Sequence, residues 1–253
     1  MTRRIAGPIA SFLLVSAVAS PLLAQAQSLS GLNPDVLRLT VFSTAFGALF
    51  VLLLWRKRLP LPPTTRRDLA RPLLVTMGVA VLIAGLLLAL AVAQQAPWRP
   101  PDMSKLGAPL AVVLIVQLVG AAAEEIGWRG LVQPLLETRL RPWIAALITG
   151  VLFAVGHFYM AFAVSPLSFA LFVLGAVGLS AVLAQVTVGY ALASRVLIAS
   201  GLHFLVNMVT FLLFNDGDGS PRYFADLALV FGICGAVALV LLARRAAPAA
   251  SGA

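Results

Sequence analysis

The stretch that decides the fold covers residues 107–129 and reads GAPLAVVLIVQLVGAAAEEIGWR. Residues 107–123 carry no charged side chain, and then two adjacent glutamates and an arginine follow. About 20 predominantly apolar residues are needed for a helix to cross a hydrocarbon core of about 30 Å. The stretch therefore predicts a transmembrane helix with charged residues near one end.

The composition of the whole chain extends this interpretation. Of 253 residues, 61% are hydrophobic and 11% are charged, and the mean hydropathy is +1.01. Soluble domains carry about 25% charged residues, so this chain has too few charges to cover a water-exposed surface. Its length suits one helical bundle and leaves no room for a separate soluble domain.

Further apolar stretches of similar length occur along the chain, without the two-residue alternation that is typical of membrane β-strands. The sequence therefore predicts an all-α, polytopic transmembrane helical bundle with seven or eight spans. The apolar stretches are 8–24, 37–55, 73–93, 107–125, 143–164, 167–187, 195–214 and 226–243.

The number of spans depends on the first stretch. Arg3 and Arg4 precede an apolar run, and Ala24-Gln25-Ala26 resembles a small-residue cleavage site. Residues 1–26 are therefore interpreted either as a signal peptide or as the first transmembrane helix.

The distribution of basic residues predicts the orientation. The linker 56–72 is rich in arginine and proline, and the positive-inside rule places it in the cytoplasm. Alternation from this linker places the C-terminus and the region around Arg129 on the cytoplasmic side, as in a multi-pass inner-membrane protein. The net charge of +9 comes from such short loops, which meet lipid headgroups, so we expect the bilayer as a partner and no nucleic acid.

Charged residues inside apolar stretches are the first indication of function. A charge at the centre of a membrane helix costs about 2.5–3.5 kcal/mol, so such residues usually face the interior and mark a site. Arg129 follows Glu125 by four residues, which places the two on one helix face as an ion pair. Glu124 points about 100° away and stays free. The alternative is a plain interfacial Glu–Arg pair.

The two histidines of the chain, His157 and His203, both lie in apolar stretches. Asn207 follows His203 by four residues and shares its helix face. Because lipid offers no hydrogen-bond partners, the simplest partners for these side chains are one another. We therefore expect Glu124, Glu125, His157 and His203 to form one site, with Asn207 beside it.

These residues lie at one depth in the bilayer only if the bounds of two of the predicted helices change. The fifth span has to enter the membrane near Ile148, which places His157 about 14 Å deep. The fourth helix has to run past Glu125, with Arg129 in a cavity. The sequence then predicts a site in the cytoplasmic half of the bilayer, open to cytosolic water.

Two hydrolytic arrangements fit these residue types. In the first, a carboxylate and a histidine transfer protons to and from water, and Asn207 donates a hydrogen bond to the oxyanion. In the second, Glu124, His157 and His203 hold Zn²⁺ and water takes the fourth position. The zinc-protease motif His-Glu-x-x-His is absent. Transport through a proton relay is a further use of such residues, although no inverted repeat is evident.

Three motifs in this order resemble the CAAX-protease and bacteriocin-processing (CPBP, or Abi) family of intramembrane proteases. The resemblance covers about residues 107–214 and uses both histidines. The motifs are Glu124-Glu125-x-x-x-Arg129, Phe153-x-x-x-His157 and His203-x-x-x-Asn207.

The resemblance implies peptide-bond cleavage by water that Glu124 and His157 activate. It further implies that His203 and Asn207 bind the oxyanion and that Arg129 secures Glu125. Descriptions of the family differ between a metalloprotease and a glutamate-type protease, so zinc stays an open cofactor. The expected substrate is a membrane-embedded or lipid-associated protein or peptide, and the alternative is a non-catalytic membrane adaptor or immunity protein.

The expected organisation follows from these assignments. Residues 1–26 are the signal peptide or first helix, and residues 27–106 hold N-terminal transmembrane helices with the basic cytoplasmic loop 56–72. Residues 107–214 form the protease-like core. Residues 215–253 hold the last transmembrane helix and a cytoplasmic tail.

Overall fold

The computed structural model describes residues 3–61, 69–96, 101–214 and 220–245, and these residues form helices and connecting segments without a strand. The prediction of an all-α polytopic bundle is confirmed. The helices are α1 (Arg3–Ser30), α2 (Ser43–Trp55), α3 (Ala70–Ala93), α4 (Leu110–Gly127), α5 (Gln133–Glu137), α6 (Pro142–Gly156), α7 (Pro166–Thr187), α8 (Leu192–Phe214) and α9 (Pro221–Arg245).

Within this described part of the chain, six helices are long and apolar enough to cross a membrane. Two shorter apolar helices, Leu39–Trp55 and Pro142–Gly156, account for the other two predicted stretches. The six long helices are Ile5–Ser30, Ala70–Ala93, Leu110–Glu137, Pro166–Thr187, Leu192–Phe214 and Pro221–Arg245.

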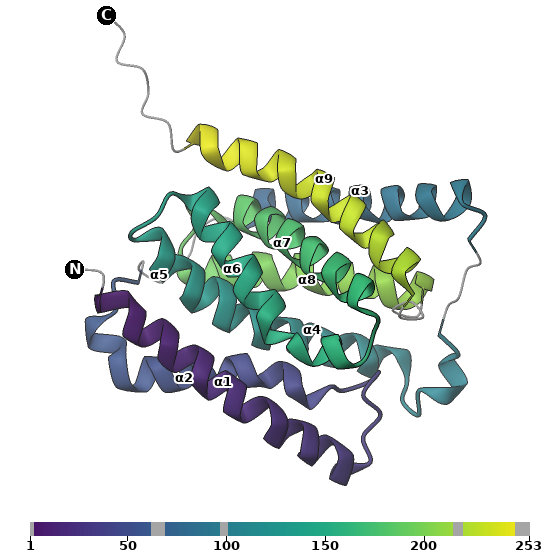
Figure 1. The fold of residues 1–253 in the computed structure, drawn as a ribbon, viewed down its shortest axis with the longest axis horizontal. Helices are drawn as coiled ribbons and strands as arrows, with labels where there is room; N and C mark the ends of the chain where they lie inside the picture. Colours follow the sequence, from purple (N-terminus) through teal and green to yellow (C-terminus); the bar gives the residue numbers. More distant parts are fainter. Residues whose placement is uncertain (1–2, 62–68, 97–100, 215–219, 246–253) are drawn as a thin grey trace, which may run out of the picture.

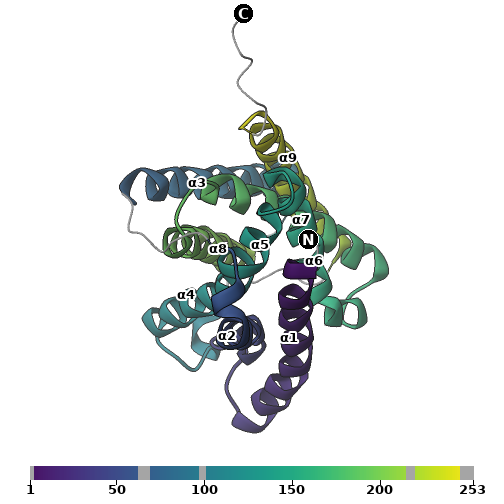
Figure 2. The same ribbon diagram turned by 90° about the vertical axis from the view of Figure 1, so that its left-hand side faces the viewer.

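The helices run roughly along one common direction (Figure 1). Helices α1 and α2 pack on each other at one side of the bundle, and α3 and α9 lie at the opposite side (Figures 1 and 2). Helices α4 to α8 lie between these two pairs, with α4 against α8 and α6 against α7. The middle of the bundle is therefore built from the segment in which the sequence motifs occur.

The fourth helix continues beyond Glu125, as the depth argument requires. A π-helical turn at Trp128–Val132 connects α4 to α5, and the N–H of Gln133 donates to the carbonyl of Trp128. Pro134 explains the wide turn, because proline lacks an N–H and its ring clashes with the carbonyl four residues earlier in a regular α-helix. The segment Leu110–Glu137 is thus one inner helix, which keeps Arg129 inside the bundle.

The predicted fifth span of residues 143–164 is wrong at its far end. Helix α6 ends at Gly156, and a short 3₁₀ segment, Phe158–Phe162, follows His157. The helix also runs unbroken through Ile148, since Pro142 begins it after the extended residue Arg141. At 1.5 Å per residue, His157 lies about 22 Å from the start of α6. The membrane entry near Ile148, and with it the depth of about 14 Å, stays a prediction.

The first stretch is part of helix α1, which packs on α2. The side chain of Phe12 is fully buried, and its ring meets that of Trp128 edge-on at 5.1 Å between centroids. Both interpretations of residues 1–26 stay predictions, but in the structure this helix contributes to the packing beneath the inner helix.

Helices α7 and α9 approach closely because both carry glycines at their contact. A Cβ atom built on Gly235 would lie 2.6 Å from the Cα atom of Gly178. Small residues at such contacts allow membrane helices to gain dispersion energy over a long interface. Gly232 lies one turn earlier on α9 and has nothing within 4 Å of a built Cβ.

We expect Gly235→Ala to lower the free energy of unfolding by about 1–3 kcal/mol, because the added methyl group forces α9 away from α7. Gly232→Ala is the matched control and should leave stability unchanged or slightly raised. Thermal unfolding of the two variants in detergent measures the difference. Equal melting temperatures would contradict the close contact of α7 and α9.

Candidate active site

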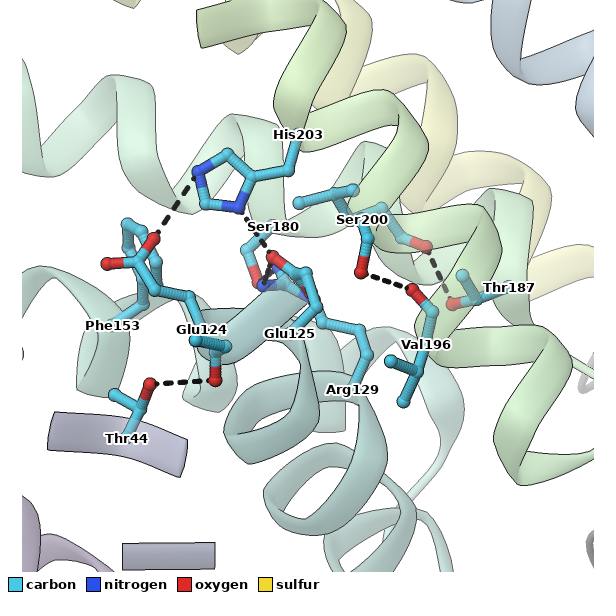
Figure 3. Close-up of polar contacts among 12 residues, drawn as sticks. Thr44, Glu124, Glu125, Arg129, Phe153, Ser180, Thr187, Val196, Ser200 and His203 are labelled. Atoms are coloured by element: carbon cyan, nitrogen blue, oxygen red, sulfur yellow. Dashed lines mark hydrogen bonds and ion pairs between the residues drawn. The ribbon is translucent and has the colours of Figure 1, made fainter. Parts of the chain in front are cut away.

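Two adjacent carboxylates lie on the inner helix, one turn before the π-helical segment. Glu125 is fully buried and Glu124 is 8% exposed. They point in different directions, as their separation of about 100° on a helix requires. Figure 3 shows both carboxylates and the side chains that surround them.

Glu125 is held by Arg129, as predicted. Arg129 Nη1 donates to Glu125 Oε1 at 3.0 Å, and the arginine side chain is 1% exposed. Arg129 Nη2 donates to Ser180 Oγ on α7 at 3.0 Å. A buried charge is tolerated only when it is paired and hydrogen-bonded, so each member of this ion pair requires the other.

His203 joins the two carboxylates. Its Nδ1 donates to Glu125 Oε1 at 2.8 Å, and its Nε2 lies 3.5 Å from Glu124 Oε2 (Figure 3). The imidazole ring is therefore oriented by Glu125 so that its second nitrogen faces Glu124. Helix α8 presents this side chain to the inner helix at the middle of the bundle.

His157 reaches Glu124 from another element. Its Nε2 lies 3.8 Å from Glu124 Oε1, and its Nδ1 lies 2.9 Å from the carbonyl oxygen of Phe153. Because a carbonyl only accepts, Nδ1 carries a proton in this contact, and Nε2 is the ring nitrogen that faces Glu124. The four ionisable residues that the sequence predicts to meet thus lie together.

Aromatic rings surround His157. The centroid of its ring lies 4.6 Å from that of Phe153, 5.6 Å from that of Phe172 and 5.9 Å from that of Tyr159. The histidine side chain is 22% exposed, more than any other ionisable side chain of the cluster. This side of the site is therefore apolar and the most open.

Asn207 lies one helical turn after His203 on α8 and is partly buried. Its backbone carbonyl accepts from Thr210, and its side-chain amide makes no hydrogen bond to any residue that the structure describes. The amide is thus uncommitted, on the helix face that carries His203.

The site lies about midway along the inner helix. Glu124 follows Leu110 by 14 residues and precedes Glu137 by 13, which at 1.5 Å per residue is about 20 Å to either end. The expected opening to the cytoplasm stays a prediction.

A second ion pair, which is partly buried, was not predicted from the sequence. Arg195 of α8 binds Glu137 through two hydrogen bonds of 2.7 Å, and Gln133 Nε2 donates to Glu137 Oε1 at 2.8 Å. The signal was the repeat of polar residues every four positions along 125, 129, 133 and 137. Ser180 was also missed, since one serine in an apolar stretch gives no signal.

The geometry does not fit the predicted zinc arrangement. His157 and His203 face different oxygens of Glu124, so one imidazole stands at each oxygen. Across residues 3–61, 69–96, 101–214 and 220–245, no group of three or more His, Cys, Asp or Glu side chains is placed to hold a metal ion. The hydrolysis proposed below therefore uses these side chains and water alone.

We expect Arg129→Ala and Glu125→Ala each to lower the free energy of unfolding by about 3–5 kcal/mol, because each leaves a buried partner charge unpaired. The double variant Glu125→Gln/Arg129→Met removes both charges and should recover much of this loss. Arg139→Ala, at an exposed position, is the control. Thermal unfolding in detergent is the measurement, and a parent-like melting temperature for Arg129→Ala would show that the pair does not stabilise the fold.

The family comparison covers this site. Residues 106–209 match the model of a family that is described as Rce1-like, type II CAAX prenyl endopeptidase Rce1-like. The matched segment includes all three motifs. No curated protein matches the chain. The predicted resemblance is confirmed over this segment: residues 106–209 are similar to the type II CAAX prenyl endopeptidases.

Proposed function

We propose that this chain hydrolyses a peptide bond in a membrane-associated protein or peptide, with a water molecule that Glu124 and His157 activate. The observation that carries the proposal is the pairing of Glu124 Oε1 with His157 Nε2 at 3.8 Å. This separation is too long for a direct hydrogen bond. Both atoms accept hydrogen bonds while His157 is neutral, so each can take one O–H of a water molecule.

The proton transfers follow from this arrangement. One of the two acceptors removes a proton from water as the water oxygen attacks the carbonyl carbon of the substrate. The C–N bond then breaks, and the same proton passes to the nitrogen of the leaving amine. Glu124 and His157 return to their starting protonation states, so the reaction needs no external acid or base.

His203 and Asn207 are proposed to stabilise the oxyanion of the tetrahedral intermediate. As an imidazolium, His203 donates from Nδ1 to Glu125 and from Nε2 towards the side of Glu124. The amide of Asn207 adds a second donor from the same helix face. Donors that are fixed before the reaction stabilise developing charge strongly in a site with little water.

Glu125 and Arg129 are proposed to support this chemistry without touching the substrate. Arg129 neutralises Glu125, and Glu125 fixes the ring of His203. The proposed site thus has four residues that contact the reacting groups and two that support them. The first are Glu124, His157, His203 and Asn207, and the second are Glu125 and Arg129. Residues 107–214 form the proposed catalytic core.

The surroundings support a membrane-associated substrate. The site lies between long apolar helices, and aromatic rings line its most exposed side, next to His157. We propose that it faces the cytoplasm of an inner membrane, since the basic loops lie at that end of the predicted topology.

We expect Glu124→Gln and His157→Ala each to reduce the rate of cleavage by about 10²–10⁴-fold, because each removes one acceptor for the water protons. The assay incubates the protein in liposomes with a membrane-protein extract and identifies new peptide N-termini by mass spectrometry. Substrate trapping with Glu124→Ala then identifies the bound peptides.

Asp35→Asn is the control for these variants, because Asp35 is an exposed acid away from the site. If the same new N-termini appear in equal amounts with the parent protein and with Glu124→Gln, the proposed role of Glu124 is wrong. A cellular phenotype that survives all motif variants would support the non-catalytic adaptor.

The geometry favours the glutamate-type mechanism, so we expect purified active protein to contain far less than about one zinc ion per chain. Cleavage should also survive prolonged chelation. Metal analysis of the purified protein and activity after dialysis against a chelator check this expectation. About one zinc ion per chain, with activity lost on chelation and restored by zinc, would favour the metalloprotease version.

A further inference from the structure

Ser180 of α7 connects three helices through one buried hydroxyl group. Its side chain is 1% exposed, and its Oγ accepts from Arg129 Nη2 at 3.0 Å. The same Oγ donates to the carbonyl oxygen of Ala146 on α6 at 3.2 Å. Figure 3 shows Ser180 beside the Glu125–Arg129 pair.

The close approach of α6 and α7 depends on Gly150. A Cβ atom built on Gly150 would lie 2.9 Å from both the Cβ atom of Ser180 and the Cα atom of Val177. Any larger residue would push the helices apart. The missing side chain therefore lets the hydroxyl of Ser180 reach the carbonyl of α6, one turn before Gly150.

The two hydrogen bonds of Ser180 differ from those of Ser200 and Thr187, whose hydroxyl groups are also buried. Ser200 donates to Val196 and Thr187 donates to Leu183, each within its own helix. Such contacts satisfy the hydroxyl and connect nothing else. Ser180 instead joins a buried guanidinium on the inner helix to a different helix, α6.

Ser180 also helps to set the plane of the Arg129 guanidinium. Glu125 holds Nη1 and Ser180 holds Nη2, while Nε has no partner among the residues described. The Oε1 atom of Glu125 that receives Nη1 also receives His203 Nδ1. A rotation of the guanidinium would therefore move the atom that orients His203.

Helix α6 carries His157 directly after its last residue, Gly156. The contact from Ser180 to Ala146 fixes α6 against the inner helix, and the inner helix carries Glu124. The separation between Glu124 and His157 thus depends on how α6 lies against the inner helix. The hydroxyl group of Ser180, which lies outside the three sequence motifs, contacts both α6 and the inner helix.

We propose that Ser180 is a positioning residue for hydrolysis, which holds α6 to the inner helix through Arg129 and so sets the geometry of Glu124 with His157 and His203. This role rests on the proposed function. In it, Ser180 contacts neither the substrate nor the reacting water. Its loss should therefore change the rate of the chemical step and not substrate binding.

Ser180→Ala tests the proposal against the control Ser200→Ala, which loses the hydroxyl of a buried serine that contacts only its own helix. We expect Ser180→Ala to lower kcat roughly tenfold or more, because small displacements of reacting groups cost that much. KM should stay within about twofold, since binding is not involved. Ser200→Ala should keep the parent kcat. A parent-like kcat for folded Ser180→Ala would overturn the proposal.

A second measurement does not need activity. The chain contains two histidines, so selective ¹⁵N labelling of histidine gives ring signals from His157 and His203 alone. We expect the ring signals to shift in Ser180→Ala and to stay in place in Ser200→Ala. Unchanged signals in Ser180→Ala would overturn the positioning role.

The two measurements separate this proposal from the proposed function. If the parent protein cleaves nothing, the proposed function fails, while the histidine signals still decide whether Ser180 positions the cluster. If Ser180→Ala does not fold, Ser180→Cys keeps most of the side-chain volume with a weaker hydrogen-bonding group. Smaller shifts of the His157 and His203 ring signals are then expected in Ser180→Cys, and unchanged signals would contradict the proposal.

Discussion

The charge of Arg129 constrains everything around it, because a guanidinium that is 1% exposed must have its partners supplied by the protein. Glu125 compensates the charge, and Ser180 accepts a further hydrogen bond. The same carboxylate oxygen of Glu125 then binds His203, so the ring direction of that histidine follows from the burial of an arginine on the inner helix. The polar cluster is thus one connected network in which each member fixes the next.

The backbone provides two conditions for this network. The π-helical turn before Pro134 lets the inner helix continue without a break, so Arg129 stays among other helices instead of entering a loop. Glycine allows neighbouring backbones to approach, at Gly150 between α6 and α7 and at Gly178 between α7 and α9. Without the approach at Gly150 the hydroxyl of Ser180 would not reach the carbonyl oxygen of Ala146.

Much of this arrangement could be predicted from the sequence, because a charge in an apolar stretch has few permitted partners. The i, i+4 spacing gave the Glu125–Arg129 pair, and the scarcity of polar groups gave the meeting of His157 and His203 with the glutamates. The end of α6 could not be predicted, since residues 157–164 are as apolar as the helix before them. Ser180 could not be predicted either, because its role depends on the distance between helices and not on its neighbours in the chain.

His157 lies outside any α-helix, so its backbone is less constrained than that of the other ionisable residues of the site. Glu124, Glu125, Arg129 and His203 lie within helices, where a displacement would break backbone hydrogen bonds that lipid cannot replace. His157 is the first residue after α6, and its backbone hydrogen bonds with Ala154 and Met160 belong to short turns. A change in its own backbone dihedral angles is therefore enough to move its ring while α6 stays in place. The least costly way to widen the space at Glu124 is therefore a local swing of this hinge. Such a change would make room for the substrate of the proposed hydrolysis while the charged framework stays assembled.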